Sequence, residues 1–281
     1  MNPRVRKASL WIFAFIMAIL LAGATYQGVA TALERRKYPH PGRLVDVGGH
    51  QLHVYCTGEG TPTVVLEAPV TGLSATWARV QPEIARRTRV CSYDRSGLGW
   101  SEAGDRPYDP GRVPEELHAL LEAAKERGPY VLVGHSLGAS FVRRFASLYP
   151  RDVSALILIN PDRELDTSAS GLLRISPWLA RAGIFRAIGV LPSGTPDLPQ
   201  PAGGAMQSFL NRPDHLTRAT REWVRWDDAV RLAGSNPFPA AIPVATVNVE
   251  SDEPLAMLSD ENVAREIRQA ILNVVARLRR K

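Results

Sequence analysis

The pentapeptide GHSLG at residues 134–138 has the residue types and the spacing of a nucleophilic site. It follows the apolar run 130–133 and precedes a helical pattern, and this strand, turn and helix context gives a G-x-S-x-G motif its meaning. A serine on such a turn projects its hydroxyl above the sheet, where the backbone N–H of the next residue can stabilise an oxyanion. The sequence therefore predicts Ser136 as a nucleophile and the N–H of Leu137 as an oxyanion donor.

Seven short runs rich in β-branched residues predict the strands that would position this turn. The later runs are almost continuously apolar, as buried parallel strands must be. The runs lie at residues 43–49, 51–58, 63–68, 88–95, 130–136, 155–160 and 243–249. Helical patterns at 114–127 and 137–149 alternate with them. This alternation predicts an α/β fold, with a mostly parallel sheet and helices on both faces.

About eighty residues between the sixth and seventh runs show no convincing strand pattern. They contain an amphipathic stretch at 171–190, a Pro/Gly-rich connector at 191–204 and a helical segment around 205–233. We predict an inserted helical subdomain, or lid, at about 163–240. The apolar face of the 171–190 stretch fits three roles, namely lying on a membrane, lining an apolar substrate pocket or packing on the main domain.

Two further segments complete a family resemblance. Residues 94–101 (DRSGLGWS) resemble the D-R-x-G-x-G-x-S loop after a fourth strand, and residues 63–77 occupy the place of an oxyanion loop. Together with GHSLG, they resemble the α/β-hydrolase superfamily, in particular its esterase-like, lid-bearing serine hydrolase branch, over residues 43–281. The resemblance implies an esterase that acts on small or lipid-like esters through an acyl-enzyme. A serine nucleophile argues against the epoxide hydrolase and dehalogenase branches, which place aspartate there.

The chain departs from the pattern of this family in its oxyanion loop. Pro69 stands where the family usually has glycine, and proline has no N–H to donate. The second oxyanion donor would therefore be the N–H of Val70. For the catalytic acid we predict Asp252, just past the seventh run, with Glu250 and Asp162 as alternatives.

The catalytic histidine is missing from its usual place. In this fold the chain order is serine, acid, histidine, yet no histidine follows Asp252. The sequence instead enters a final helix capped by Ser259 or Asp260, so the segment that carries an eighth strand and the histidine is absent. His215 of the lid is the only histidine after Ser136. Two hypotheses remain open, namely a serine hydrolase impaired by the lack of this base, and a catalytically inactive binding or scaffolding protein.

Residues 8–33 contain no charged side chain, and a helix of this length and composition inserts into a membrane. We predict that residues 1–37 form a membrane anchor, with a cleavable signal segment and a secreted protein as the alternative. The basic residues before the apolar stretch favour a single-pass topology with the hydrolase domain outside the cytoplasm. The net charge of +6 arises at the two ends of the chain, which excludes a nucleic-acid-binding surface on the body.

The two cysteines, Cys56 and Cys91, lie in the second and fourth predicted strands. The strand order of the resembled family makes these strands neighbours, so a cross-strand disulfide and two buried thiols both stay open. We expect no cofactor and no metal, because the sequence has no metal-ligand spacing and no Gly-rich phosphate loop. The sequence does not predict an oligomeric state.

Overall fold

A central sheet organises the computed structural model, which describes residues 3–161, 170–189, 197–235, 237–249 and 258–280. The strands are β1 (Arg43–Asp46), β2 (Gln51–Thr57), β3 (Val64–Glu67), β4 (Val90–Tyr93), β5 (Tyr130–His135), β6 (Val153–Ile159) and β7 (Val244–Val247). All seven predicted strands are confirmed. Their order in the sheet is β1-β2-β4-β3-β5-β6-β7, and the described residues after β7 add no eighth strand.

The sheet is mixed at one edge and parallel in its centre. β1 pairs with β2, and β2 with β4, in the antiparallel sense. The other neighbours, from β4 through β3, β5 and β6 to β7, are parallel. The residues of β3, β4 and β5 are buried throughout, because helices cover both faces of the sheet.

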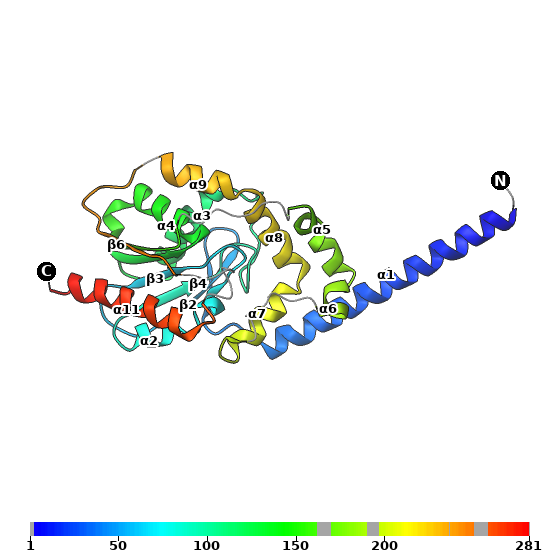
Figure 1. Cartoon of the computed structure of the whole chain (residues 1–281), viewed down its shortest axis with the longest axis horizontal. Coiled ribbons are helices and arrows are strands. Elements are labelled where there is room, and N and C mark those ends of the chain that lie inside the picture. Colours follow the sequence, from blue (N-terminus) through cyan, green and yellow to red (C-terminus); the bar gives the residue numbers. More distant parts are fainter. Residues whose placement is uncertain (1–2, 162–169, 190–196, 236, 250–257, 281) are drawn as a thin grey trace.

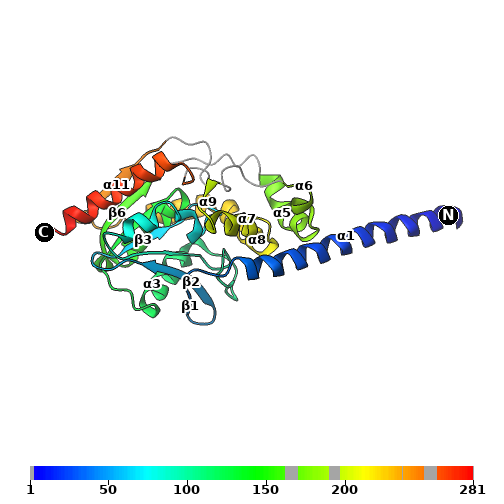
Figure 2. The same ribbon diagram turned by 90° about the horizontal axis from the view of Figure 1, so that it is seen from below.

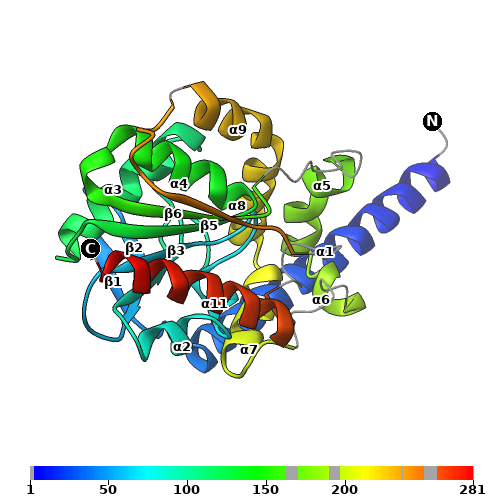
Figure 3. The ribbon, with the colours of Figure 1, turned by 60° about the vertical axis from the view of Figure 1, so that its left-hand side comes forward.

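Helices α3 (Val113–Ala123) and α4 (Leu137–Leu148) cover one face of the sheet, whereas α2 (Gln81–Ala85) and α11 (Glu261–Leu278) cover the other (Figure 3). Each face has its own apolar core. Phe145 of α4 packs in the first core, and Ile267 of α11 packs in the second. The carboxylate of Asp260 caps α11 by accepting hydrogen bonds from two backbone N–H groups, which confirms one of the two predicted caps.

Five helices lie between β6 and β7 in the described part of the chain. They are α5 (Ser170–Arg181), α6 (Ile184–Ile188), α7 (Ala202–Leu210), α8 (Pro213–Val224) and α9 (Trp226–Ser235). The stretch expected at 171–190 is broken because Gly183 adopts a left-handed conformation, with φ 72°. The segment expected around 205–233 is divided, because Pro213 lacks an N–H and starts a new helix.

Helix α1 (Pro3–Lys37) is long and apolar enough to cross a membrane by length and composition. Its N-terminal part projects away from the body, whereas its C-terminal part lies beside the lid (Figures 1 and 2). Helix α1 is in close contact with the α5–α6 connection, because a Cβ added at Gly23 would stand 2.1 Å from the carbonyl oxygen of Ala182. Nε2 of Gln27 donates to the Asn211 carbonyl at 2.8 Å, and Arg186 pairs with Glu34. Helix α1, the predicted anchor, is thus joined to the helices between β6 and β7, the predicted lid.

Cys56 and Cys91 form a disulfide. The register of β2 and β4 places them directly opposite each other, which decides between the two alternatives that the sequence left open. The two sulfurs and a Glu126 carboxylate oxygen lie within 4.8 Å of one another. They do not make a metal site, because sulfurs bonded to each other provide no thiolate ligand.

Candidate active site

Ser136 lies on the sharp turn between β5 and α4. Its φ of 54° and ψ of −119° are outside the regions that non-glycine residues usually adopt. Backbone hydrogen bonds hold the turn from both sides, because the Ser136 N–H donates to the Ile159 carbonyl at 2.9 Å and its own carbonyl accepts from Ala139 N–H at 2.9 Å. A strained residue fixed in this way is typical of functional sites.

The glycines on either side allow this turn to form. An added Cβ at Gly134 would stand 2.5 Å from the Gly138 carbonyl oxygen. At Gly138 it would stand 2.7 Å from the carbonyl oxygens of both Glu67 and Ala68. The first residues of α4 are therefore in close contact with the loop that follows β3, which is the predicted oxyanion loop.

The predicted oxyanion residues lie together. The side chains of Val70 and Leu137 belong to one buried apolar cluster, which also contains Phe141. The loop turns at Pro69, whose carbonyl accepts from the Gly72 N–H at 3.0 Å. The left-handed conformation that proline cannot adopt occurs two residues later, at Thr71, with φ 60°. Pro69 is accommodated in this way, and the Val70 N–H stays a predicted donor.

A buried guanidinium holds the predicted oxyanion loop. Arg95 is 2% exposed, and it donates to the carbonyls of Ala68 at 2.9 Å and of Pro69 at 2.8 Å. It also pairs with Glu67 of β3 at 2.6 Å and, through two hydrogen bonds of 2.8 Å, with Glu222 of α8. Burial raises the pKa of Glu222, but Arg95 and Arg218 lower it more, so the pKa lies below its ordinary value.

This charge cluster connects the loop to the lid. Glu67 is also fully buried, and burial raises its pKa despite the neighbouring Arg95. The sequence does not reveal this cluster, because Arg95 and Glu222 are 127 residues apart and share no local motif. The only available signal was the Asp-Arg pair at the start of the 94–101 motif, which does not identify its partners.

The Ser136 hydroxyl is buried in the structure. The residue is 1% exposed, and Oγ makes no hydrogen bond to any residue that the structure describes. Asp252 lies outside the described residues, as do the alternatives Glu250 and Asp162. The predicted acid therefore stays a prediction.

Residues 62–183 match the family model described as alpha/beta hydrolase fold. This range contains the oxyanion loop, the 94–101 motif and the Ser136 turn. The chain is an α/β-hydrolase-fold protein.

Solved structures share this α/β-hydrolase fold over most of the chain. The epoxide hydrolase CorEH has a TM-score of 0.64 at 16% identity, covering 84% of this chain and 98% of that one. The enol-lactonase from Burkholderia xenovorans has a TM-score of 0.55 at 20% identity, with coverages of 81% and 87%. At these identities the likeness shows the fold.

Curated relatives match the α/β-hydrolase region over shorter lengths. An uncharacterised protein of Schizosaccharomyces pombe is 33% identical over 121 residues, which make up 41% of this chain and 23% of that protein. An uncharacterised vacuolar membrane protein of Saccharomyces cerevisiae is 32% identical over 128 residues, or 39% and 20% of the two chains. This chain thus spans less than a quarter of either relative.

Two histidines of this α/β-hydrolase fold lie near the 94–101 loop. His53 is buried, and its Nδ1 lies 3.0 Å from Asp94 Oδ2. The Asp94 carboxylate also accepts from the N–H groups of Ser74 and Trp100, so it fixes the loop. His215, the candidate base, is 1% exposed on α8, and its Nδ1 accepts from the Gly99 N–H at 3.2 Å.

Burial lowers the pKa of His215 to about 4, so the imidazole is neutral at neutral pH. The neutral form is the one that a general base requires, although so low a pKa makes a weak base. No hydrogen bond or ring contact between described residues joins His215 to Ser136. The ring instead lines a cleft that Ser136 does not reach.

Proposed function

We propose that this chain is a membrane-anchored serine hydrolase of esterase type, which acts on small or lipid-like esters through an acyl-enzyme on Ser136. One observation carries the proposal, namely the strained conformation of Ser136 between β5 and α4. This conformation aims a hydroxyl past the start of a helix and beside a loop that can supply a second N–H donor.

The proposed reaction has two steps. Ser136 Oγ attacks the ester carbonyl carbon, and the alcohol leaves with the serine proton. Water then attacks the acyl group, the acid leaves, and the proton returns to Ser136. The N–H groups of Leu137 and Val70 would stabilise the oxyanion in both steps, and Asp252 would supply the carboxylate.

The names of two structural neighbours, an epoxide hydrolase and an enol-lactonase, support a hydrolytic reaction on this fold. We expect slow turnover from this chain. Without a positioned base, a serine hydroxyl is a poor nucleophile at neutral pH, and only the oxyanion hole and binding energy remain.

The lid and the anchor support a lipid-like substrate. The helices α5 and α6 expose large apolar side chains beside α1, whose apolar part would occupy a bilayer. These exposed side chains are Ile175, Trp178, Ile184 and Ile188. They would rest on the membrane surface, where a lipid-like ester is available.

For localisation we propose a single-pass membrane protein with its hydrolase domain outside the cytoplasm. The charges before the apolar stretch and the Cys56–Cys91 disulfide support that side, because disulfides persist in oxidising compartments. The printed name of the yeast relative, a vacuolar membrane protein, is consistent with a membrane location. Secretion after signal cleavage is the alternative.

The second candidate function is a catalytically inactive α/β-hydrolase-fold module for binding or scaffolding. One observation favours it, namely that no described imidazole reaches Ser136 Oγ. A fluorophosphonate probe separates the two, because it reacts with an activated serine. We expect the full chain to be labelled slowly, in line with its slow turnover, and Ser136→Ala not to be labelled. Absence of labelling on the folded wild-type chain would support the module instead.

A further inference from the structure

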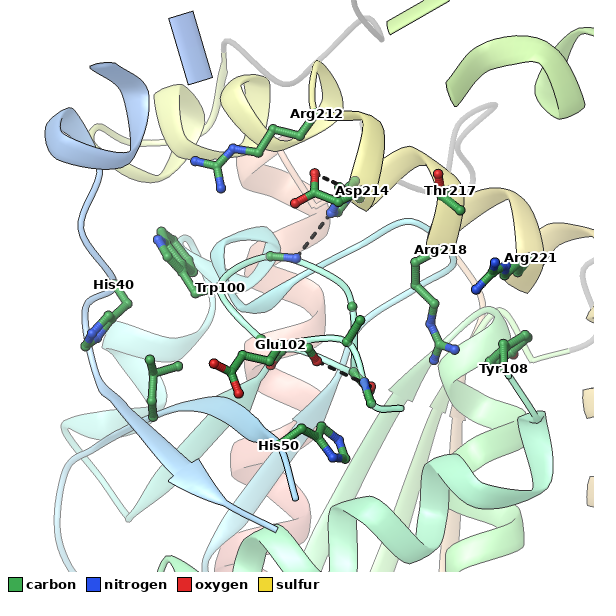
Figure 4. A pocket seen from close by; sticks show the side chains of 18 of the residues that line it. His40, His50, Trp100, Glu102, Tyr108, Arg212, Asp214, Thr217, Arg218 and Arg221 are labelled. Atoms are coloured by element: carbon green, nitrogen blue, oxygen red, sulfur yellow. Dashed lines mark hydrogen bonds between the residues drawn. The ribbon is translucent and has the colours of Figure 1, made fainter. Parts of the chain in front are cut away.

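A large cleft separate from the Ser136 turn is lined with arginines (Figure 4). Its volume is about 880 Å³, and its walls come from residues 96–104, the β1–β2 hairpin, α8 and the end of α1. The arginines are Arg35, Arg106, Arg181, Arg212, Arg218 and Arg221. Ser136 is not among the lining residues, so the cleft needs an explanation of its own.

In the part of the chain that the structure describes, carboxylates pair with only two of these six arginines. Asp214 pairs with Arg35 at 3.8 Å, and both of these side chains are 64% exposed. The Glu102 carboxylate accepts from the Gln51 N–H at 2.8 Å. Arg218 pairs with Glu222 at 3.3 Å.

The remaining four arginines form no ion pair with a carboxylate of the described chain. They are Arg106, Arg181, Arg212 and Arg221. An open cleft with this surplus of guanidinium groups attracts an anion.

Among these arginines, Arg212 is the one that is buried without an ion pair to any described residue. It is 4% exposed, its guanidinium lies 4.1 Å from the Phe209 ring centroid, and Nη2 donates to the Ser208 hydroxyl at 3.3 Å. Its Nε has no hydrogen-bond partner among the described residues. Burial lowers the pKa of Arg212 to about 10, although the charge of the nearby Asp214 opposes this effect. A buried cation that forms no ion pair is costly, and an anion in the cleft would relieve that cost.

The position of α1 identifies where such an anion would come from. Arg35, the first basic residue after the uncharged stretch of α1, lines the cleft. Because it follows that uncharged stretch in the chain, it would stand on the head-group side of the hydrocarbon core. This is the depth of lipid head groups, and arginine binds phosphate oxygens through two parallel hydrogen bonds.

We propose that the arginine-lined cleft is a binding site for the phosphate of an anionic lipid head group. The site is independent of Ser136. The lipid source, in contrast, rests on the proposed insertion of α1 into a membrane. The cleft would hold the lid and the loop 96–104 at the bilayer surface, because its walls include α8 and that loop.

The test uses the full chain in a neutral detergent, titrated with three probes and followed by native mass spectrometry. The probes are dioctanoyl phosphatidylglycerol, dioctanoyl phosphatidylcholine and glycerol 3-phosphate. We expect phosphatidylglycerol to bind at least about tenfold more tightly than the other two. Arg212→Gln and Arg181→Gln should each weaken it by about tenfold. Ser136→Ala should bind as the wild type does, whatever the outcome of the labelling experiment.

Arg174→Gln is the matched control, because Arg174 is exposed on the same helix as Arg181 but does not line the cleft. Its affinity should not change. Circular dichroism checks that each variant folds, and Arg181 is exposed, so Arg181→Gln keeps the test valid if Arg212→Gln misfolds. Equal binding of the two lipids, or insensitivity to both substitutions, would overturn the site. Equally tight binding of glycerol 3-phosphate would overturn the lipid source.

Discussion

Arg95 and Arg212 are both buried guanidinium groups, but their surroundings differ. Arg95 contacts two buried carboxylates, Glu67 and Glu222, and its pKa is raised well above the ordinary value, because these carboxylates outweigh the effect of burial. Arg212 has no carboxylate partner among the described residues, and burial lowers its pKa to about 10. The first arginine is neutralised within the fold, whereas the second has a charge that a ligand can neutralise.

Helix α8 connects the two environments. Glu222 on this helix binds Arg95, which in turn holds the carbonyls of the oxyanion loop. Arg212 precedes the same helix, and His215 and Arg218 face the cleft from it. One helix is therefore linked, through Arg95, to the loop beside the proposed nucleophile and also lines the proposed anion site.

The largest expected effect follows from Arg95→Met. This substitution leaves Glu67 buried without a cation and Glu222 with Arg218 as its only cation, so we expect it to lower the free energy of unfolding by about 3–5 kcal/mol. Chemical unfolding of the purified chain in detergent, followed by circular dichroism, measures the change. A loss below about 1 kcal/mol would show that the cluster does not hold the oxyanion loop.

The second effect is the pH dependence that His215 introduces. Its pKa is about 4 in the folded protein against an ordinary 6.5, so the unfolded chain takes up the proton first as the pH falls. The stability that the neutral His215 contributes is therefore fully present above pH 6.5. It is lost as the pH falls from 6.5 to 4, and no further loss comes from His215 below pH 4. The total loss corresponds to about 3 kcal/mol.

The comparison with His215→Gln isolates this contribution. We expect the difference in the free energy of unfolding between the wild type and the variant to change by about 3 kcal/mol between pH 6.5 and 4. A difference that stays constant from pH 7 to 4 would contradict burial of a neutral imidazole at this position.

Arg212→Met should have an effect of the opposite sign. The substitution removes a buried cation that has no carboxylate partner, so we expect the ligand-free chain to gain about 1 kcal/mol in the free energy of unfolding. The measurement is the same unfolding experiment in lipid-free detergent. A marked destabilisation would mean that Arg212 has a structural partner after all and would remove the contrast with Arg95.

The smallest effect is expected for Arg231→Gln, which serves as the surface reference. Arg231 pairs with Asp228 on α9, and its side chain is 73% exposed. Exposed ion pairs contribute little, so the free energy of unfolding should change by less than about 0.5 kcal/mol. A larger change would indicate that charge removal alone, rather than its location, determines the other results.

The periodic parts of the fold were predicted from the sequence. The seven strands, helix α4 and the Asp260 cap of α11 depend on local patterns, and the structure confirms them. The break at Gly183 was missed because an amphipathic pattern continues across a residue whose φ only the structure reveals. Glycine within a helical pattern is an ambiguous signal.

Contacts between residues that are distant in the sequence were harder to predict. The pairing of Cys56 with Cys91 depends on the register between β2 and β4, which the sequence did not determine. Arg95 finds Glu222 only after the lid folds over the sheet. The Ser136 turn could be predicted because its glycines and flanking elements are all adjacent in the sequence, whereas Asp252 lies outside the described residues.

The proposed role of Ser136 is tested most directly by trapping an acyl-enzyme. The full chain is incubated with an activated ester, such as p-nitrophenyl butyrate, quenched in acid and mapped by peptide mass spectrometry. Our account predicts one acyl group on the peptide that contains Ser136, and none in Ser136→Ala. An acyl group on another residue, or an unmodified Ser136 peptide in the folded wild-type chain, would contradict it.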